Sequence, residues 1–278
     1  MTASNLKPTV TPALAIAVFD IDGVVRDVGG SYRRALADTV EHYTSGAYRP
    51  SQVDIDTLKS EGVWNNDWEA SQELVYRYFE KQGKNRTEIP LDYNTLVAFF
   101  QSRYRGPNPE NWTGYICTEP LLLAPNYLET LTTAGIPWGF FSGATRGSAE
   151  YVLCKRLGLK SPVLIAMEDA PGKPDPTGLF ATVQLLEQQF SADETTPVIY
   201  IGDTVADMYT VEKAKLLQPS RQWIGVGILP PHVLQETSQQ LDAYTANLKQ
   251  AGAQTILRNV QELTAAKIQA LVAVEQSI

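Results

Sequence analysis

The runs of apolar residues in this chain constrain its fold more than any other feature. They are short, rich in β-branched and aromatic residues, bounded by turn signals, and apolar on both alternating faces. They span residues 15–19, 138–141, 163–166, 198–201, 223–226 and 255–257. Continuously apolar strands are typical of parallel sheets that are covered on both faces. Helical patterns lie between the runs, at 126–134, 148–157, 177–189 and 237–250. This alternation predicts a doubly wound α/β fold with a Rossmann-like parallel sheet.

One interval, residues 29–114, breaks the strand–helix rhythm. It shows no convincing strand, only amphipathic helical periodicity at 31–44, 55–61, 70–82 and 93–104. The interval opens at "DVGGS" and closes at "RGPNPENWTG", and both stretches are rich in turn formers. We therefore expect an α-helical cap (29–114) inserted into a core made of 13–28 and 115–278, after a loose N-terminal tail (1–12).

Charge and composition exclude several classes of protein. The 278 residues carry a net charge of −8, which argues against nucleic-acid binding and against an anionic membrane surface. Two cysteines (Cys117, Cys154) and two histidines (His42, His232) form neither a zinc-like cluster nor a disulfide framework. No secretory signal is visible, and no apolar run approaches the ~20 residues that span a bilayer. We expect a cytoplasmic protein that binds neither nucleic acid nor membrane.

Acids and potential phosphate ligands follow the predicted strands. Asp20 and Asp22 follow the first strand, Ser142 the second and Asp203 the fourth, and Lys173 lies in the loop after the third. Ligands bind at the carboxyl ends of strands in such sheets, so these groups should meet at one edge. Acids so close together repel each other unless a cation holds them, and ligands that are all oxygen suit Mg²⁺. A phosphate group can bind between the metal, Lys173, Ser142 and backbone N–H groups.

This arrangement predicts phosphoryl transfer. A carboxylate next to bound phosphorus can act as a nucleophile and form an aspartyl-phosphate. A second acid, two residues on, is placed to protonate the leaving oxygen and then to activate water.

Four segments, "DIDGVVRD", "FSGATR", "GKPDP" and "GDTVADM", resemble the ordered motifs of the haloacid dehalogenase-like hydrolase superfamily. The subgroup resembled carries a helical cap after the first motif and includes phosphoglycolate phosphatase-like enzymes. The resemblance implies Asp20 as nucleophile and Asp22 as general acid/base. The other implied residues are phosphate ligands, Mg²⁺ ligands and one supporting acid. These are Ser142, Gly143 and Lys173 for phosphate; Asp20, Asp22 and Asp203 for the metal; and Asp207 as the supporting acid.

Structural explanations compete with these roles. Strand-end acids can belong to a calcium loop, but Val24 stands where such a loop wants an oxygen ligand. Ser142 lies in "GFFSG", which is not the G-x-S-x-G pattern of a serine hydrolase. Glu168 and Asp169 are either site residues or solvated loop acids, and the sequence leaves both open.

The cap segment "EGVWNNDWEASQ" is a candidate for the substrate-facing lip. On that interpretation Trp64 covers an organic group while Asn65, Asn66 and Asp67 bind hydroxyls. The alternative is that the tryptophans only anchor the end of a helix. Arg33 either meets a second anionic group of the substrate or is solvated.

We therefore expect a magnesium-dependent phosphatase that hydrolyses a small phosphorylated metabolite through an aspartyl-phosphate. The alternatives are a phosphomutase acting on a sugar phosphate and a non-catalytic binding protein of the same fold. Dehalogenase chemistry is disfavoured, because the resembling dehalogenases lack an acid at the position of Asp22.

Overall fold

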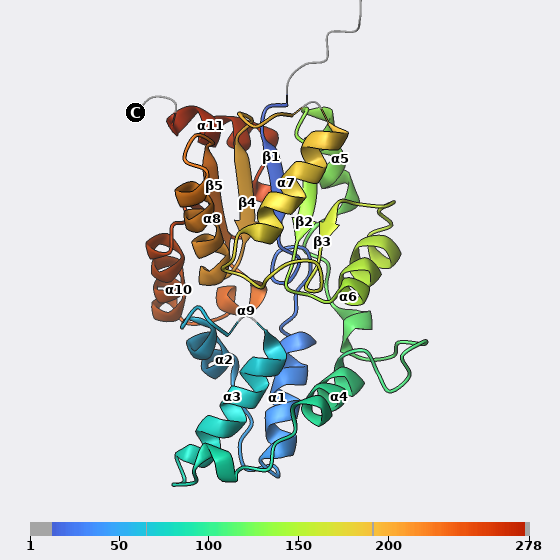
Figure 1. The fold of residues 1–278 in the computed structure, drawn as a ribbon, viewed down its shortest axis with the longest axis vertical. Coiled ribbons are helices and arrows are strands. Elements are labelled where there is room, and N and C mark those ends of the chain that lie inside the picture. The colour runs from blue at the N-terminus through green and yellow to red at the C-terminus, as the bar shows by residue number, and fades with distance from the viewer. Residues whose placement is uncertain (1–12, 65, 191, 276–278) are drawn as a thin grey trace, which may run out of the picture.

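The core of the protein is a six-stranded parallel sheet, shown in Figure 1 for the computed structural model, which describes residues 13–64, 66–190 and 192–275. The strands are β1 (Ile16–Phe19), β2 (Trp138–Phe141), β3 (Leu164–Ile165), β4 (Val198–Gly202), β5 (Trp223–Ile228) and β6 (Thr255–Leu257). Their order is β3-β2-β1-β4-β5-β6, and each neighbouring pair is parallel. The predicted doubly wound α/β fold is confirmed. The predicted tail, 1–12, lies outside the described residues.

Helices cover both faces of the sheet, which explains why the strands are apolar throughout. One face packs against α5 (Pro125–Thr133), α6 (Arg146–Glu150) with its π-helical continuation (Tyr151–Arg156), and α11 (Ala265–Glu275). The other packs against α7 (Thr177–Gln189) and α8 (Val205–Leu217). Within β1 the faces alternate: Ala17 and Phe19 point to the first layer, and Ile16 and Val18 to the second. Later in the chain, α9 (Pro231–Leu234) and α10 (Ser238–Gln250) lie between β5 and β6, and the 3₁₀ turn η4 (Val260–Glu262) follows β6.

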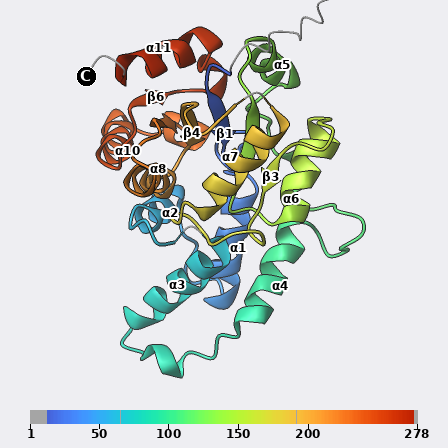
Figure 2. The same ribbon diagram turned by 45° about the horizontal axis from the view of Figure 1, so that its top comes forward.

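Most of the segment between β1 and β2, the part that precedes α5, forms the helical cap, which projects from the carboxyl ends of the strands (Figures 1 and 2). Its described part contains helices and loops but no strand. The helices are α1 (Tyr32–Tyr43), α2 (Gln52–Lys59), α3 (Asp67–Glu80) and α4 (Tyr93–Tyr104), with 3₁₀ turns η1 (Arg86–Glu88) and η2 (Tyr115–Thr118). They enclose their own apolar cluster, which includes Leu36, Ile55, Val75 and Phe100.

Two cap helices begin three residues earlier than their apolar periodicity predicts, because polar caps set their first turns. Ser51 and Asp54 form a capping box at the start of α2. The Asn66 side chain accepts hydrogen bonds from Trp68 N and Glu69 N at the start of α3.

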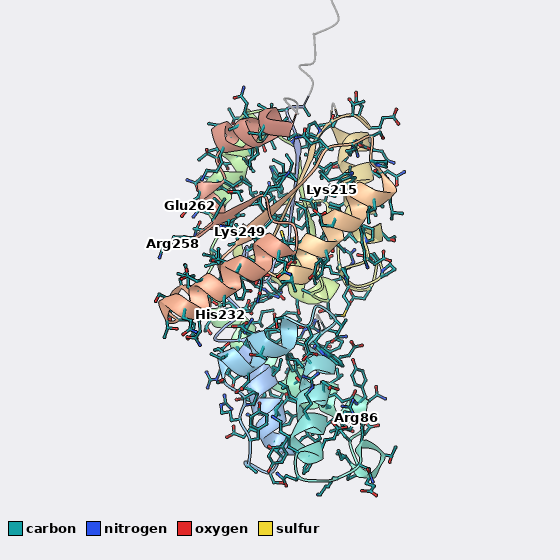
Figure 3. All side chains as sticks on the ribbon, turned by 90° about the vertical axis from the view of Figure 1, so that its left-hand side faces the viewer. Arg86, Lys215, His232, Lys249, Arg258 and Glu262 are labelled. Atoms are coloured by element: carbon teal, nitrogen blue, oxygen red, sulfur yellow. The ribbon has the colours of Figure 1, made fainter. Side chains whose placement is uncertain are left out.

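The chain enters and leaves the cap through adjacent segments. Asp27 N donates to Pro120 O at 2.9 Å, and Leu122 N donates to Val25 O at 2.8 Å. A second contact between core and cap joins His232 of α9 to Asp56 of α2, with 3.2 Å between Nε2 and Oδ2. Figure 3 shows His232 at the level where the two parts meet. Among the described residues, no helix has the length and apolar character needed to cross a bilayer.

Candidate active site

The ends of β1, β2 and β4 bring the predicted residues together. β1 pairs with both β2 and β4, so Asp20, Ser142 and Asp203 emerge side by side at one edge. A cavity of about 50 Å³ lies over this edge and is lined by Asp20, Asp22, Ser142, Gly143 and Asp203. Residues of the cap close its other side. The site therefore lies between core and cap.

Lys173 is a buried cation held between two carboxylates. Its Nζ lies 2.9 Å from Asp20 Oδ2 and 2.6 Å from Asp207 Oδ1. Burial opposes its charge, but the two acids outweigh this effect and raise the pKa of Lys173 above its usual range. Lys173 therefore stays charged beside Asp20, where a phosphate group would need positive charge.

Asp207 anchors Lys173 and lines no part of the cavity over the strand ends. Its Oδ1 also accepts a hydrogen bond from Tyr200 Oη at 3.0 Å. Its Oδ2 accepts from Thr204 N at 2.9 Å and from Thr204 Oγ1 at 2.7 Å, within the capping box that starts α8. Burial opposes ionisation, but Lys173 and these donors lower the pKa of Asp207. These contacts are those of a supporting residue.

Asp203 and Asp20 form a buried pair of acids, and the positive charge of Lys173 is too little to keep both carboxylates ionised without a cost. Carboxylate oxygens of Asp20, Asp203 and Asp207 lie within 4.8 Å of one another. No described residue donates a hydrogen bond to the Asp203 carboxylate, which is 7% exposed. Burial has the largest effect on Asp203, and together with the negative charges of Asp207 and Asp20 it raises the pKa of Asp203 well above its usual range. Burial also raises the pKa of Asp20 to about 7, although Lys173 opposes this shift.

A cation bound by Asp20 and Asp203 would remove this electrostatic cost. The donors are oxygens, which fits Mg²⁺ or a similar hard divalent ion. The neighbouring turn leaves space for nothing larger than glycine: a Cβ added to Gly23, whose φ is +74°, would lie 2.0 Å from Asp203 Oδ2. The acid cluster therefore fits a hard divalent cation.

Asp22 stands apart from the three clustered acids. Its Oδ1 accepts a hydrogen bond from Arg26 Nε at 2.6 Å, and its side chain is 26% exposed toward the cavity. The predicted role of Asp22 as a metal ligand stays a prediction.

The loops after β2 and β3 brace each other. Ser142 is buried, and its Oγ accepts from Ala144 N at 3.1 Å. Glu168 Oε2 accepts from Arg146 N at 2.8 Å, while Asp169 Oδ2 accepts from Ala166 N at 2.7 Å and pairs with Arg146. The contacts of Glu168 and Asp169 are thus those of loop supports.

The structure divides the predicted cap residues. Arg33 and Asp67 line the same cavity as Asp20; Arg33 pairs with Asp56 at 2.5 Å, and Asp67 with Lys59 at 2.8 Å. Asn66 lines an adjoining cavity of about 280 Å³, together with Ser142, Gly143 and Lys173.

Trp64 is not brought to either cavity. It packs against the apolar cluster of the cap, and its Nε1 donates to Glu61 Oε2 at 2.8 Å. These contacts agree with the alternative interpretation, in which the tryptophan has a structural role in the cap and does not contact substrate. Asn65 lies outside the described residues.

Several lining residues carry no usable signal in the sequence. Tyr32, Lys59, Met167 and Thr204 line the cavity over Asp20. A lysine at the end of an exposed-looking helix or a methionine in a loop is too common to single out. Arg26 is different, because a charged residue inside the apolar stretch after Asp22 is itself a signal of a buried, paired side chain.

The family model for haloacid dehalogenase-like hydrolases matches residues 14–215. Among curated proteins, the chain is 28% identical over 245 residues to imidazoleglycerol-phosphate dehydratase from Phytophthora nicotianae. That alignment covers 86% of this chain and 49% of the relative, so the chain spans about half the length of that relative.

Solved structures share the fold at low sequence identity. A phosphonoacetaldehyde hydrolase-like protein from Oleispira antarctica superposes with a TM-score of 0.65, at 16% identity, covering 97% of this chain and 98% of that one. A phosphatase from Thermococcus thioreducens gives a TM-score of 0.55 at 22% identity, covering 82% and 98%. These similarities establish the shared architecture.

Proposed function

Because the chain belongs to the haloacid dehalogenase-like hydrolase family, we propose that it is a magnesium-dependent phosphatase acting on a small phosphate monoester. One observation carries the proposal: Lys173 is buried in contact with Asp20, beside Asp203, whose carboxylate accepts no hydrogen bond from the part of the chain that the structure describes. Together these groups provide a nucleophile, a fixed positive charge for phosphate oxygens, and the oxygen ligands of a divalent cation.

The proposed reaction has two displacements at phosphorus. Asp20 attacks the phosphorus while the bond to the ester oxygen breaks, and Asp22 gives its proton to that oxygen. Lys173 and N–H groups of the Ser142–Gly143 loop hold the phosphate oxygens as charge develops. A water molecule then attacks the phosphorus of the aspartyl-phosphate, Asp22 takes its proton, and inorganic phosphate leaves Asp20 free.

Mg²⁺ bound by Asp20 and Asp203 would supply Lewis-acid charge to the phosphate oxygens. The cap contributes Arg33, Lys59 and Asp67 to the same cavity, which supports a role for these side chains in contacting the organic part of the ester. Two free cysteines, one of them exposed, fit a reducing compartment such as the cytoplasm.

Hydrolysis of p-nitrophenyl phosphate tests the proposal. We expect activity with Mg²⁺, its loss in EDTA, and at least a 10²-fold loss of kcat in Asp20→Asn, since the amide is a poor nucleophile. Asp242→Asn, at an exposed position of α10, is the matched control and should match wild type. Absence of hydrolysis across a panel of phosphorylated metabolites would instead favour a binding protein. Feeble hydrolysis with isomerisation of a sugar monophosphate, primed by a bisphosphate, would favour a phosphomutase.

The panel should include imidazoleglycerol phosphate, the phosphate monoester in the name of the curated relative. Hydrolysis of this ester releases inorganic phosphate, whereas dehydration releases none. A phosphate assay run beside detection of the organic product therefore separates the activity we propose from the activity named for that longer protein.

A further inference from the structure

Arg26 is a fully buried cation next to the proposed acid/base. Its Nε donates to Asp22 Oδ1 at 2.6 Å, and its Nη1 donates to Tyr104 Oη at 2.6 Å and to Glu119 Oε2 at 3.0 Å. Nη2 also lies 2.6 Å from Asp22 Oδ1, without a directed hydrogen bond. Nothing in the reaction described above uses this guanidinium, yet it holds one oxygen of Asp22.

The chain passes from the core to the cap near Asp27 and returns near Pro120, and we call these two segments the outgoing and the return crossing. The partners of Arg26 come from the cap and from the return crossing: Tyr104 ends cap helix α4, and Glu119 follows η2. Glu119 Oε1 accepts a hydrogen bond from Ser31 Oγ at 2.5 Å, and Ser31 is the N-cap of α1 on the outgoing crossing. Arg26 itself lies where the two crossings are paired, and it forms a bridge with Leu121. The guanidinium therefore joins Asp22 to both crossings and to the cap.

We propose that Arg26 is a positioning residue for Asp22, fixing the direction of its carboxylate according to the position of the cap. The inference rests on the proposed phosphatase function. A buried guanidinium cannot leave its partners without a large cost, because an unpaired buried charge strongly destabilises a protein. When Tyr104 and Glu119 move with the cap, Arg26 must follow them, and the oxygen of Asp22 that it holds must turn as well.

The planar guanidinium is needed for this linkage. It offers several donors at fixed angles, so it can bind Asp22 on one edge while binding Tyr104 and Glu119 on another. A lysine ammonium keeps the charge, but it cannot hold three partners in this fixed geometry. Arg26→Lys therefore separates the geometric role from the charge.

The leaving group of the substrate provides the test. p-Nitrophenolate is stable as an anion and departs without a proton, whereas an alkyl alkoxide must be protonated as it leaves. Values of kcat/KM report the steps up to departure of the leaving group, so p-nitrophenyl phosphate and a simple alkyl phosphate should be compared with Mg²⁺ present. We expect Arg26→Lys and Tyr104→Phe to lower kcat/KM for the alkyl ester about tenfold more than for the aryl ester.

Two matched controls separate positioning from general damage to the fold. Arg221→Lys changes a buried arginine that pairs with Glu187 far from the cavity, and Tyr127→Phe removes a buried hydroxyl that donates to Leu263 O. Both should change the two esters by the same factor. In an Asp22→Asn background, Arg26→Lys should add no further difference between the esters, because the group it positions is gone.

Four outcomes decide the matter. A larger loss for the alkyl ester in both test variants, abolished by Asp22→Asn, supports the positioning role. Equal losses for both esters overturn it while leaving the phosphatase proposal intact. If Arg26→Lys does not fold, Tyr104→Phe, which removes a single hydroxyl, decides alone. Wild-type protein that hydrolyses neither ester overturns the proposed function and this inference with it.

Discussion

At the scale of single residues, the ionised carboxylate of Asp203 carries an electrostatic cost that a bound cation would remove. Its carboxylate is buried beside Asp207 and Asp20 and receives no hydrogen bond from any described residue. It lines the cavity, and its charge is held in a largely desolvated place next to other acids, which disfavours the ionised form. The residue that makes the site suitable for a cation therefore destabilises the protein without one.

We predict that Asp203→Asn raises the melting temperature in EDTA and abolishes the stabilisation by Mg²⁺. In wild type, a hundredfold excess of Mg²⁺ over its Kd should stabilise the fold by about 2.7 kcal/mol. Because the pKa values of Asp203 and Asp20 are raised, the metal-free folded state binds more protons than the unfolded state above pH about 4. Stability in EDTA should therefore fall as the pH rises toward about 7, less steeply in Asp203→Asn.

Differential scanning fluorimetry measures both effects, with Asp242→Asn as the control. An undiminished Mg²⁺ shift in Asp203→Asn would contradict a metal site at this residue. The amide is nearly isosteric with the carboxylate, so a change in side-chain volume does not affect the comparison.

At the scale of secondary-structure elements, the contact between α2 and α9 holds the cap against the core. His232 Nε2 lies 3.2 Å from Asp56 Oδ2, and Arg33 pairs with the same carboxylate. Burial and Arg33 lower the pKa of His232 despite the opposing effect of Asp56. His232 is therefore neutral near pH 7 and donates a hydrogen bond to Asp56.

We predict that NMR titration of the ring nitrogens gives His232 a pKa below its ordinary 6.5, and that Asp56→Asn lowers it further. The unfolded state then binds more protons between the folded pKa and 6.5, so this histidine's contribution to stability rises with pH across that window and is lost as the pH falls. With two histidines in the chain, His232→Gln assigns the signal. A pKa at or above 6.5 would be incompatible with this account.

Element types were predictable where local pattern decides them. Continuously apolar runs gave the six strands, and the strand-end rule placed Asp20, Ser142 and Asp203 at one edge. Among the described residues, three helices had no prediction: α8, α9 and α11. In α11 apolar side chains surround the helix, so no single stripe marks it. The links of Arg26 to Tyr104 and Glu119 span 78 and 93 residues, and no local pattern encodes partners so distant.

At the scale of the whole molecule, the negative net charge of the protein opposes the binding of the proposed substrate. The net charge is −8, and a phosphate monoester is an anion. Lys173, Arg33 and Lys59 offset this field only locally. Screening of the long-range repulsion should therefore favour substrate binding.

We predict that KM for p-nitrophenyl phosphate falls about twofold when ionic strength rises from about 0.01 M to 0.15 M, since the Debye length shrinks from about 30 Å to 8 Å. The measurement needs two salts with different anions, because an anion that competes for the phosphate site would raise KM. A KM that rises equally in both salts would mean that the local cations dominate the field.

The pairing of the two crossings bears on how such a protein can diversify. Residues 25–27 and 120–122 are hydrogen-bonded neighbours, so whatever lies between them starts and ends at one place on the core. An insertion there can grow or be exchanged without moving β1 or β2, and each doubling of its length costs only about 0.6 kcal/mol in loop entropy. Descendants of one gene can thus inherit the reaction unchanged while the inserted segment, evolving separately, supplies new choices of substrate.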